Sequence, residues 1–138
     1  MDTKFAQAIH MLVFIAETDR VASSQALASS IGTNASHTRK LAGLLKQARL
    51  IDSQQGKAGF ILLKPTTAIT LADIYSAVYP DKQLFAAHTD PNPECPVGKH
   101  IGQVLAPTFT RIEQDLEQAL GSRTLRDFIA ELYDAARG

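Results

Sequence analysis

Residues 24–49 carry the pattern that most constrains the fold of this chain. Ser23 or Ser24 is suited to cap a short helix, because a serine side chain accepts a hydrogen bond from the free backbone amides of the first turn. Gly32 is expected to end that helix, since glycine adopts the left-handed conformation after a helix at little cost. A second, longer helix then runs to about Ala48. The pattern predicts two helices joined by a tight turn.

The spacing of residues across this turn favours a helix-turn-helix. Ala28 is a small residue where the two helices would cross, Gly32 follows it in the turn, and Thr38 supplies an anchor on the second helix. Thr33 or Asn34 is expected to cap the second helix. A helix-turn-helix places its second helix in the major groove of DNA. The side chains expected to face inward from that helix are Thr38, Leu41, Leu44 and Leu45.

The segment behind the second helix, residues 49–63, predicts a β-hairpin. Leu50-Ile51 and residues 60–63 are apolar strand segments, and Gly56 and Gly59 punctuate the turn between them. A hairpin in this position is the wing of a winged helix, and its loop can reach a phosphate or a minor groove beside the reading helix. The other interpretation is an ordinary domain of three helices and a hairpin with no role on DNA.

Four further stretches repeat apolar residues every three or four positions, which indicates amphipathic helices. These predicted helices span residues 3–17, 71–79, 100–120 and 124–136. Thr3 and Thr70 are expected to cap the first and second of them. His10 lies beside the first stripe and is expected to be a histidine at the edge of the core. Residues 80–99 lack periodicity and contain four prolines, so they predict a loop. Pro107 marks a kink or a fresh start in the long helix.

These elements predict a mainly α-helical fold with a small β-hairpin wing: a winged helix-turn-helix followed by a long C-terminal dimerisation helix. At 138 residues the chain fits one domain, or one domain with a helical arm. The expected parts are a DNA-binding domain over 1–66, a linking helix and Pro-rich loop over 67–99, and a dimerisation helix with a C-terminal helix over 100–138. A long helix with one apolar seam most simply packs on a copy of itself. The seam contains Ile101, Leu105, Ile112 and Leu116.

The net charge of zero hides a difference between the two halves of the chain. Residues 1–66 hold eight Lys/Arg and four Asp/Glu, whereas residues 67–138 hold six and ten. Such an asymmetry hints at nucleic-acid contact by one half, although solvated helices can produce an equal imbalance. No run of 18 apolar residues exists, so no membrane span is expected. The N-terminal segment is too acidic and too amphipathic for a signal peptide, so a cytoplasmic protein is expected.

The candidate DNA-contacting side chains gather on and near the second helix. Arg39 and Lys40 lie opposite the inward anchor and can pair with guanine, while Ser36 can meet a base edge or a phosphate. Residues of the first helix and the wing are better suited to phosphate contacts. The full candidate set is Ser24, Gln25, Asn34, Ser36, His37, Arg39, Lys40, Lys46, Gln55 and Lys57.

The order of parts resembles the Rrf-two (Rrf2) family of bacterial winged-helix repressors. The matching stretches are Leu27-Ala28 with Gly32, Arg39-Lys40-Leu41, the wing over 56–60, and Ile69-Thr70-Leu71-Ala72-Asp73-Ile74, which matches the family's I-T-L-x-D-I step. The resemblance covers nearly the whole chain. It implies a DNA-binding transcriptional regulator, expected to be a homodimeric repressor. The wing departs from the family pattern, because Gln55 and Ala58-Gly59 stand where an arginine and adjacent glycines are usual.

Cys95 is the single cysteine of the chain, whereas cluster-binding members of the family place three in this loop. An iron–sulfur cluster typically needs four ligands, mostly thiolates. The chain therefore resembles the cluster-free branch, and neither a cofactor nor a metal is expected. Cys95 is a candidate redox or effector-sensing thiol, because Lys99, His100 and a helix start nearby would favour the thiolate. An incidental structural cysteine is the other interpretation.

Catalysis is not expected from this sequence. A dyad of Cys95 and His100 would lack an oxyanion-hole signature, a Gly-rich phosphate loop and a cluster of metal ligands. The expected partners are double-stranded DNA, a second copy of the chain, and a small-molecule or redox effector. The operator would be a pseudo-palindrome with half-sites about one helical turn apart, or a multiple of that. The alternative is a protein-interaction adaptor that binds a metabolic enzyme or another partner through the winged helix.

Overall fold

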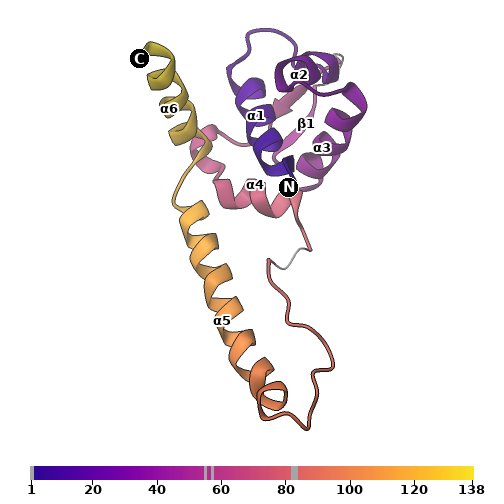
Figure 1. The fold of residues 1–138 in the computed structure, drawn as a ribbon. Coiled ribbons are helices and arrows are strands. Elements are labelled where there is room, and N and C mark those ends of the chain that lie inside the picture. The colour runs from indigo at the N-terminus through magenta and orange to yellow at the C-terminus, as the bar shows by residue number, and fades with distance from the viewer. Residues whose placement is uncertain (1, 55, 57, 82–83) are drawn as a thin grey trace.

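The computed structural model describes residues 2–54, 56, 58–81 and 84–138, and it divides into a compact helical body and a projecting helix (Figure 1). The body elements are α1 (Lys4–Glu17), α2 (Ser24–Ile31), α3 (Ala35–Gln47), β1 (Ile51–Ser53), β2 (Phe60–Leu62), the short 3-10 helix η1 (Thr66–Ala68) and α4 (Leu71–Val78). The projecting helix α5 (Pro96–Gly121) leads back to the body, where α6 (Leu125–Arg137) lies beside α1. The expected helix-rich fold with one hairpin is confirmed.

Helix α1 is the centre of the body. It contacts α2, α3, α4, α6 and β2. Its side chains Met11 and Leu12 are fully buried and belong to the core cluster. Burying a side chain of this size contributes about 1.5–3 kcal/mol each. The other large core side chains are Leu27, Leu41, Leu45, Leu50, Ile51, Ile69, Ile74, Leu125 and Ile129.

Caps and a glycine fix the turn between α2 and α3. Ser23 Oγ accepts a hydrogen bond from the backbone amide of Ala26 at 3.1 Å. Asn34 Oδ1 accepts one from the amide of His37 at 2.8 Å. Gly32 has φ of 87°, the left-handed conformation in which a side chain would be strained. Of the alternatives left open by the sequence, Ser23 and Asn34 are therefore the caps.

The hairpin behind α3 pairs Ile51 with Leu62 in antiparallel register. Its second strand lies close to the segment between α1 and α2, since the amide of Phe60 donates to the carbonyl of Ala22 at 3.0 Å. A Cβ added to Gly59 would lie 2.5 Å from Cγ1 of Val21. Only glycine therefore allows the strand to approach so closely. The hairpin follows α3 directly, as expected of a wing.

Two expectations about helix starts were wrong in detail. Thr3 occupies the cap position of α1 without a side-chain cap; the amide of Lys4 instead donates to Asp2 Oδ1 at 2.7 Å. The long helix begins at Pro96 rather than at residue 100, because proline suits a first helical turn whose amides have no partner. The same helix continues through Pro107 to Gly121, so that proline does not mark a fresh start.

The second half of the chain is attached to the body at a short junction. Thr70 and Thr124 cap α4 and α6, each in a reciprocal capping box with the aspartate three residues later. The two threonines also face each other as an isolated β-bridge. Here the amide of Leu125 donates to the carbonyl of Ile69 at 2.7 Å. The junction fixes the start of α6 beside the start of α4.

Helix α5 has no buried residue, although it is amphipathic and spans about 39 Å at ~1.5 Å per residue. Val104 is 63% exposed and Ile112 is 43% exposed. The loop before the helix turns back on it, because the amides of Leu84 and Phe85 both donate to Glu113 Oε1, at 3.1 and 3.3 Å. The apolar side chains of α5 are thus only partly covered in the described part of the chain, where Phe109 packs on Phe85 and Leu120 on the core. No helix in the described part of the chain is long and apolar enough to cross a membrane.

Candidate nucleic-acid interface

One face of α3 presents polar and basic side chains to solvent. Ser36, Arg39, Lys40, Gly43 and Lys46 are all exposed, and each has another member of the set three or four positions away. Residues at that spacing lie on one side of a helix. The opposite side is formed by the buried residues Thr38, Leu41, Ala42 and Leu45. The arrangement holds the helix by its apolar side and leaves the basic side free for a partner.

Thr38 is the anchor that the sequence predicted. Its side chain is fully buried, and its Oγ1 donates to the carbonyl oxygen of Asn34 at 3.1 Å. The hydroxyl is therefore satisfied within α3, so burial leaves no orphaned polar atom. The β-branched methyl group is free to pack in the core. Leu44, also expected inward, is only half-buried.

Three of the candidate residues are engaged within the protein. The Nε2 atom of His37 lies 2.6 Å from Oε1 of Gln7. Asn34 caps α3 with its side-chain oxygen. Lys46 Nζ donates to Ser53 Oγ on β1 at 3.0 Å, which links the reading helix to the wing. Ser36, Arg39 and Lys40 form the exposed part of the face nearest the helix N-terminus.

The first turn of α2 holds two more candidates. Ser24 is half-buried and Gln25 is exposed. The free backbone amides of a helix N-terminus attract phosphate oxygens, and both side chains can add donors there. Gln55 and Lys57, the candidates on the wing, lie outside the described residues. Gly56, between them, has φ of 76° and is exposed, as a tight turn at a wing tip requires.

The sequence stretch that carries this face contains basic residues and no acidic ones. No Asp or Glu occurs between Asp19 and Asp52, while that stretch contains Arg20, Arg39, Lys40, Lys46 and Arg49. A region without acidic groups has no intramolecular charge to oppose the approach of a polyanion. The charge split seen between the two halves is therefore concentrated on the helix-turn-helix.

Gln7 is a residue that sequence reasoning missed. It lies on the half-buried polar side of α1 and holds the His37 ring against that helix. A side-chain contact between residues thirty positions apart leaves no periodic signal in the sequence. Only the packing of α1 against α3 brings the two together.

Cys95 is exposed at the start of α5. The backbone amides of Gly98 and then Val97 point at its sulfur and hold the pKa of the thiol below its ordinary value, because they stabilise the thiolate. Among the described residues, no group of three or more His, Cys, Asp or Glu side chains is placed to hold a metal ion. The possible ligands near Cys95 therefore do not form a metal site with it.

Comparison with known proteins gives one consistent result. The family model described as "Rrf2: Iron-dependent Transcriptional regulator" matches residues 1–131. The Bacillus subtilis (strain 168) protein named "Putative HTH-type transcriptional regulator YwnA" is 38% identical over 133 residues, covering 96% of this chain and 99% of that one. Two solved structures share the fold: IscR of T. potens (TM-score 0.72, 20% identity, 98% of this chain and 89% of that one) and CymR of B. subtilis, titled its global cysteine regulator (TM-score 0.68, 21% identity, 95% and 96%).

Proposed function

The chain belongs to the Rrf2 family of transcriptional regulators, and on that premise we propose that it is a homodimeric repressor that binds a pseudo-palindromic operator. The observation that carries the proposal is the exposed face of α3, where Ser36, Arg39 and Lys40 stand clear of the core. Arginine and lysine pair with guanine O6 and N7 in the major groove. Ser36 is suited to a base edge or to a phosphate.

Phosphate contacts fix the register of such a reader on the duplex. We assign them to Ser24 and Gln25 at the start of α2, to Lys46, and to Gln55 and Lys57 on the wing. Asn34 and His37 act first within the protein, as cap and as ring bonded to Gln7. Their contribution to DNA binding is to hold the N-terminal turn of α3 in position, with their remaining polar atoms free for phosphate.

The incompletely buried seam of α5 supports the homodimer. Ile101, Leu105, Ile112 and Leu116 follow one face of a helix that has no fully buried residue. Packing against the same helix of a second copy would remove these side chains from water and would relate the two α3 helices by a two-fold axis. Half-sites about one helical turn apart, or a multiple, match such a dimer. A protein acting on chromosomal DNA in a bacterium works in the cytoplasm.

Iron is not part of the proposal, although the family description includes it. A cluster typically needs four ligands, mostly thiolates, and this chain supplies one. The donor set therefore does not fit a cluster. Regulation by an effector, including oxidation of Cys95, is compatible with a chain of this kind.

The family and its named relative are transcriptional regulators rather than enzymes, as the sequence predicted. The adaptor alternative would also use the winged helix. The acid-free basic stretch between Asp19 and Asp52 favours duplex DNA over a protein partner. The salt dependence of binding distinguishes DNA binding from binding to a protein partner, because contacts with phosphates release counterions and contacts with a protein need not.

The experiment is selection of bound duplexes from a random pool, followed by titration of the enriched site at several salt concentrations. We expect enrichment of one pseudo-palindrome. The logarithm of its binding constant should fall linearly with the logarithm of the salt concentration, with a slope of about −0.9 per phosphate contact. Failure to enrich any sequence, or an affinity that salt does not change, would reject the assignment.

A further inference from the structure

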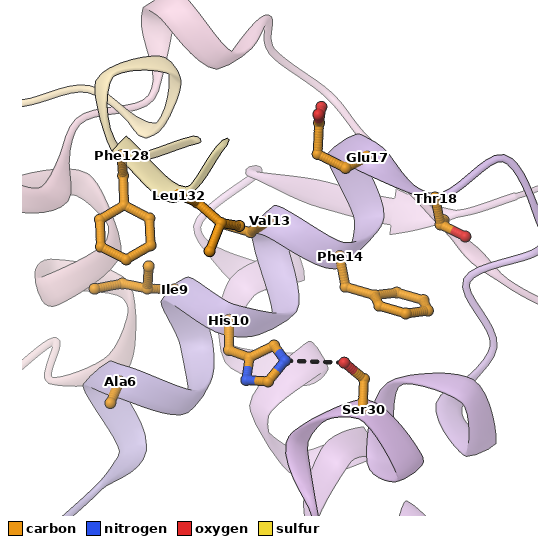
Figure 2. Close-up of a pocket in the computed structure, with 10 residues that line it drawn as sticks. All are labelled: Ala6, Ile9, His10, Val13, Phe14, Glu17, Thr18, Ser30, Phe128 and Leu132. Atoms are coloured by element: carbon orange, nitrogen blue, oxygen red, sulfur yellow. Dashed lines mark hydrogen bonds between the residues drawn. The ribbon is translucent and has the colours of Figure 1, made fainter. Parts of the chain in front are cut away.

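A cavity of about 740 Å³ lies between α1 and α6, with Ser30 of α2 at one side (Figure 2). Small-molecule sites in proteins typically have volumes of about 300–1,000 Å³ and predominantly apolar walls. This cavity fits both descriptions. Its apolar lining consists of Ala6, Ile9, Val13 and Phe14 from α1 and of Phe128 and Leu132 from α6.

The cavity is recessed rather than flat. Val13 contributes to its lining while being only 7% exposed, and Ile9, Phe14 and Phe128 are half-buried. A recess with a buried apolar floor and a volume in this range is suited to a small molecule.

Polar groups meet the cavity at its edges. His10 Nε2 lies 2.9 Å from Ser30 Oγ, so the ring is directed to α2 (Figure 2). Glu17 Oε1 accepts a hydrogen bond from the hydroxyl of Tyr133 on α6. A carboxylate has a second oxygen with lone pairs to offer, and it can accept a donor from a ligand. The edge near Glu17 thus favours a donor and disfavours an anion.

We propose that this cavity binds a small, mainly apolar molecule, aromatic or branched, that carries a hydrogen-bond donor and no negative charge. The walls belong to α1, α2 and α6. The site therefore joins a helix of the helix-turn-helix, α2, to the C-terminal helix α6. None of the lining residues is among those assigned to DNA contact, although Ser30 belongs to α2 of the helix-turn-helix.

The test uses two fluorescent probes with one scaffold on the purified full chain at pH 8. N-phenyl-1-naphthylamine is apolar, uncharged and carries one N–H donor; 1-anilinonaphthalene-8-sulfonate is the same scaffold with a negative charge. We expect saturable binding of the first at one probe per chain. The second should bind at least about tenfold more weakly, because its sulfonate would face the Glu17 carboxylate.

Leu132→Trp fills the cavity from α6 and should weaken binding of the uncharged probe at least about tenfold. Leu132 is 46% exposed, so the larger side chain is tolerated by the fold. Ala6→Trp fills the cavity from α1 and should give the same loss, which guards against a folding defect in one variant. Leu63→Trp, at a site 48% exposed and outside the cavity, is the matched control and should bind like the wild type.

Absence of saturable binding to the wild type would overturn the proposal, as would undiminished binding by both cavity-filling variants. If a second copy of the chain occupies the cavity instead, the wild-type dimer will not bind the probe. The Leu132→Trp variant will then sediment as a monomer. That outcome also overturns the ligand site. Titration of the wild type with its selected duplex is run alongside, so a failed ligand site is distinguished from a failed DNA-binding assignment.

Discussion

His37 Nε2 on α3 lies 2.6 Å from Gln7 Oε1 on α1, so the reading helix is hydrogen-bonded to the central helix of the body. The contact is partly buried and lies at the N-terminal turn of α3, next to Ser36. This pair fixes the N-terminal turn of α3, the part of the proposed DNA-contacting face closest to Ser36, beside the buried anchor Thr38.

Replacing either His37 or Gln7 should remove the same hydrogen bond and therefore lower stability by a similar amount. Gln7→Leu and His37→Leu are each expected to lower the free energy of unfolding by about 1 kcal/mol, the net value of a typical hydrogen bond. The double variant should cost little more than one of the singles, because only one contact is lost. Urea denaturation of the four proteins measures this coupling; strictly additive losses would show that the two side chains act separately.

A side chain at position 59 should lower the stability of the fold. In Gly59→Ala the new Cβ would meet Val21 Cγ1 at 2.5 Å and the backbone of Ala22. We expect a loss of about 1–3 kcal/mol in stability, as for overpacking elsewhere. Gly43→Ala is the control, because nothing lies within 4 Å of its Cβ position and alanine is the better helix former. Thermal melts would contradict the account if the two variants were equally stable.

The seam of α5 should control oligomeric state. Ile112→Glu places a charge where the proposed dimer buries an apolar side chain, and burying an unpaired charge is costly. The dissociation constant of the dimer should rise at least about a hundredfold, equivalent to ~2.8 kcal/mol. Gln118→Glu, a similar charge change away from the seam, should leave it unchanged. Sedimentation at several concentrations checks both; an unaffected Ile112→Glu dimer would place the interface elsewhere.

Cys95 should react at lower pH in the folded chain than in the unfolded chain. The amides of Gly98 and Val97 favour the thiolate, and the pKa of the thiol is thereby lowered. At a given pH below the ordinary value, the folded protein thus holds more thiolate, the reactive form. Rates of alkylation by iodoacetamide across pH, in buffer and in urea, should show the midpoint shifted downward in buffer. A midpoint that is equal or higher in buffer would contradict the shift.

Local patterns in the sequence predicted much of the fold. Gly32, the serine and asparagine caps and the three- to four-residue periodicity of α1, α4 and α6 are all encoded by neighbours in the chain, and the structure confirms them. The start of α5 at Pro96 was missed because prolines in a polar stretch predict a loop, whereas one proline at a first helical position also begins a helix.

The site was predictable only in outline. The exposed face of Ser36, Arg39 and Lys40 follows from helical spacing once Thr38 and Leu41 are taken as buried. The engagement of His37 by Gln7, and the cavity between α1 and α6, depend on packing between distant segments. Neither a hydrogen bond across thirty residues nor a space between two helices has a local sequence signal.

The central claim is that the exposed face of α3 reads DNA. It is tested most directly by titrating Arg39→Ala and Lys40→Ala against the selected duplex and against a version with one altered half-site. Each substitution is expected to cost about 1–3 kcal/mol on the selected duplex if the contact is a bidentate base pair, and to reduce the preference for it. Arg126→Ala, an exposed arginine of α6, is the control and should bind like the wild type. Affinities of Arg39→Ala and Lys40→Ala equal to that of the wild type on both duplexes would show that this face does not read DNA.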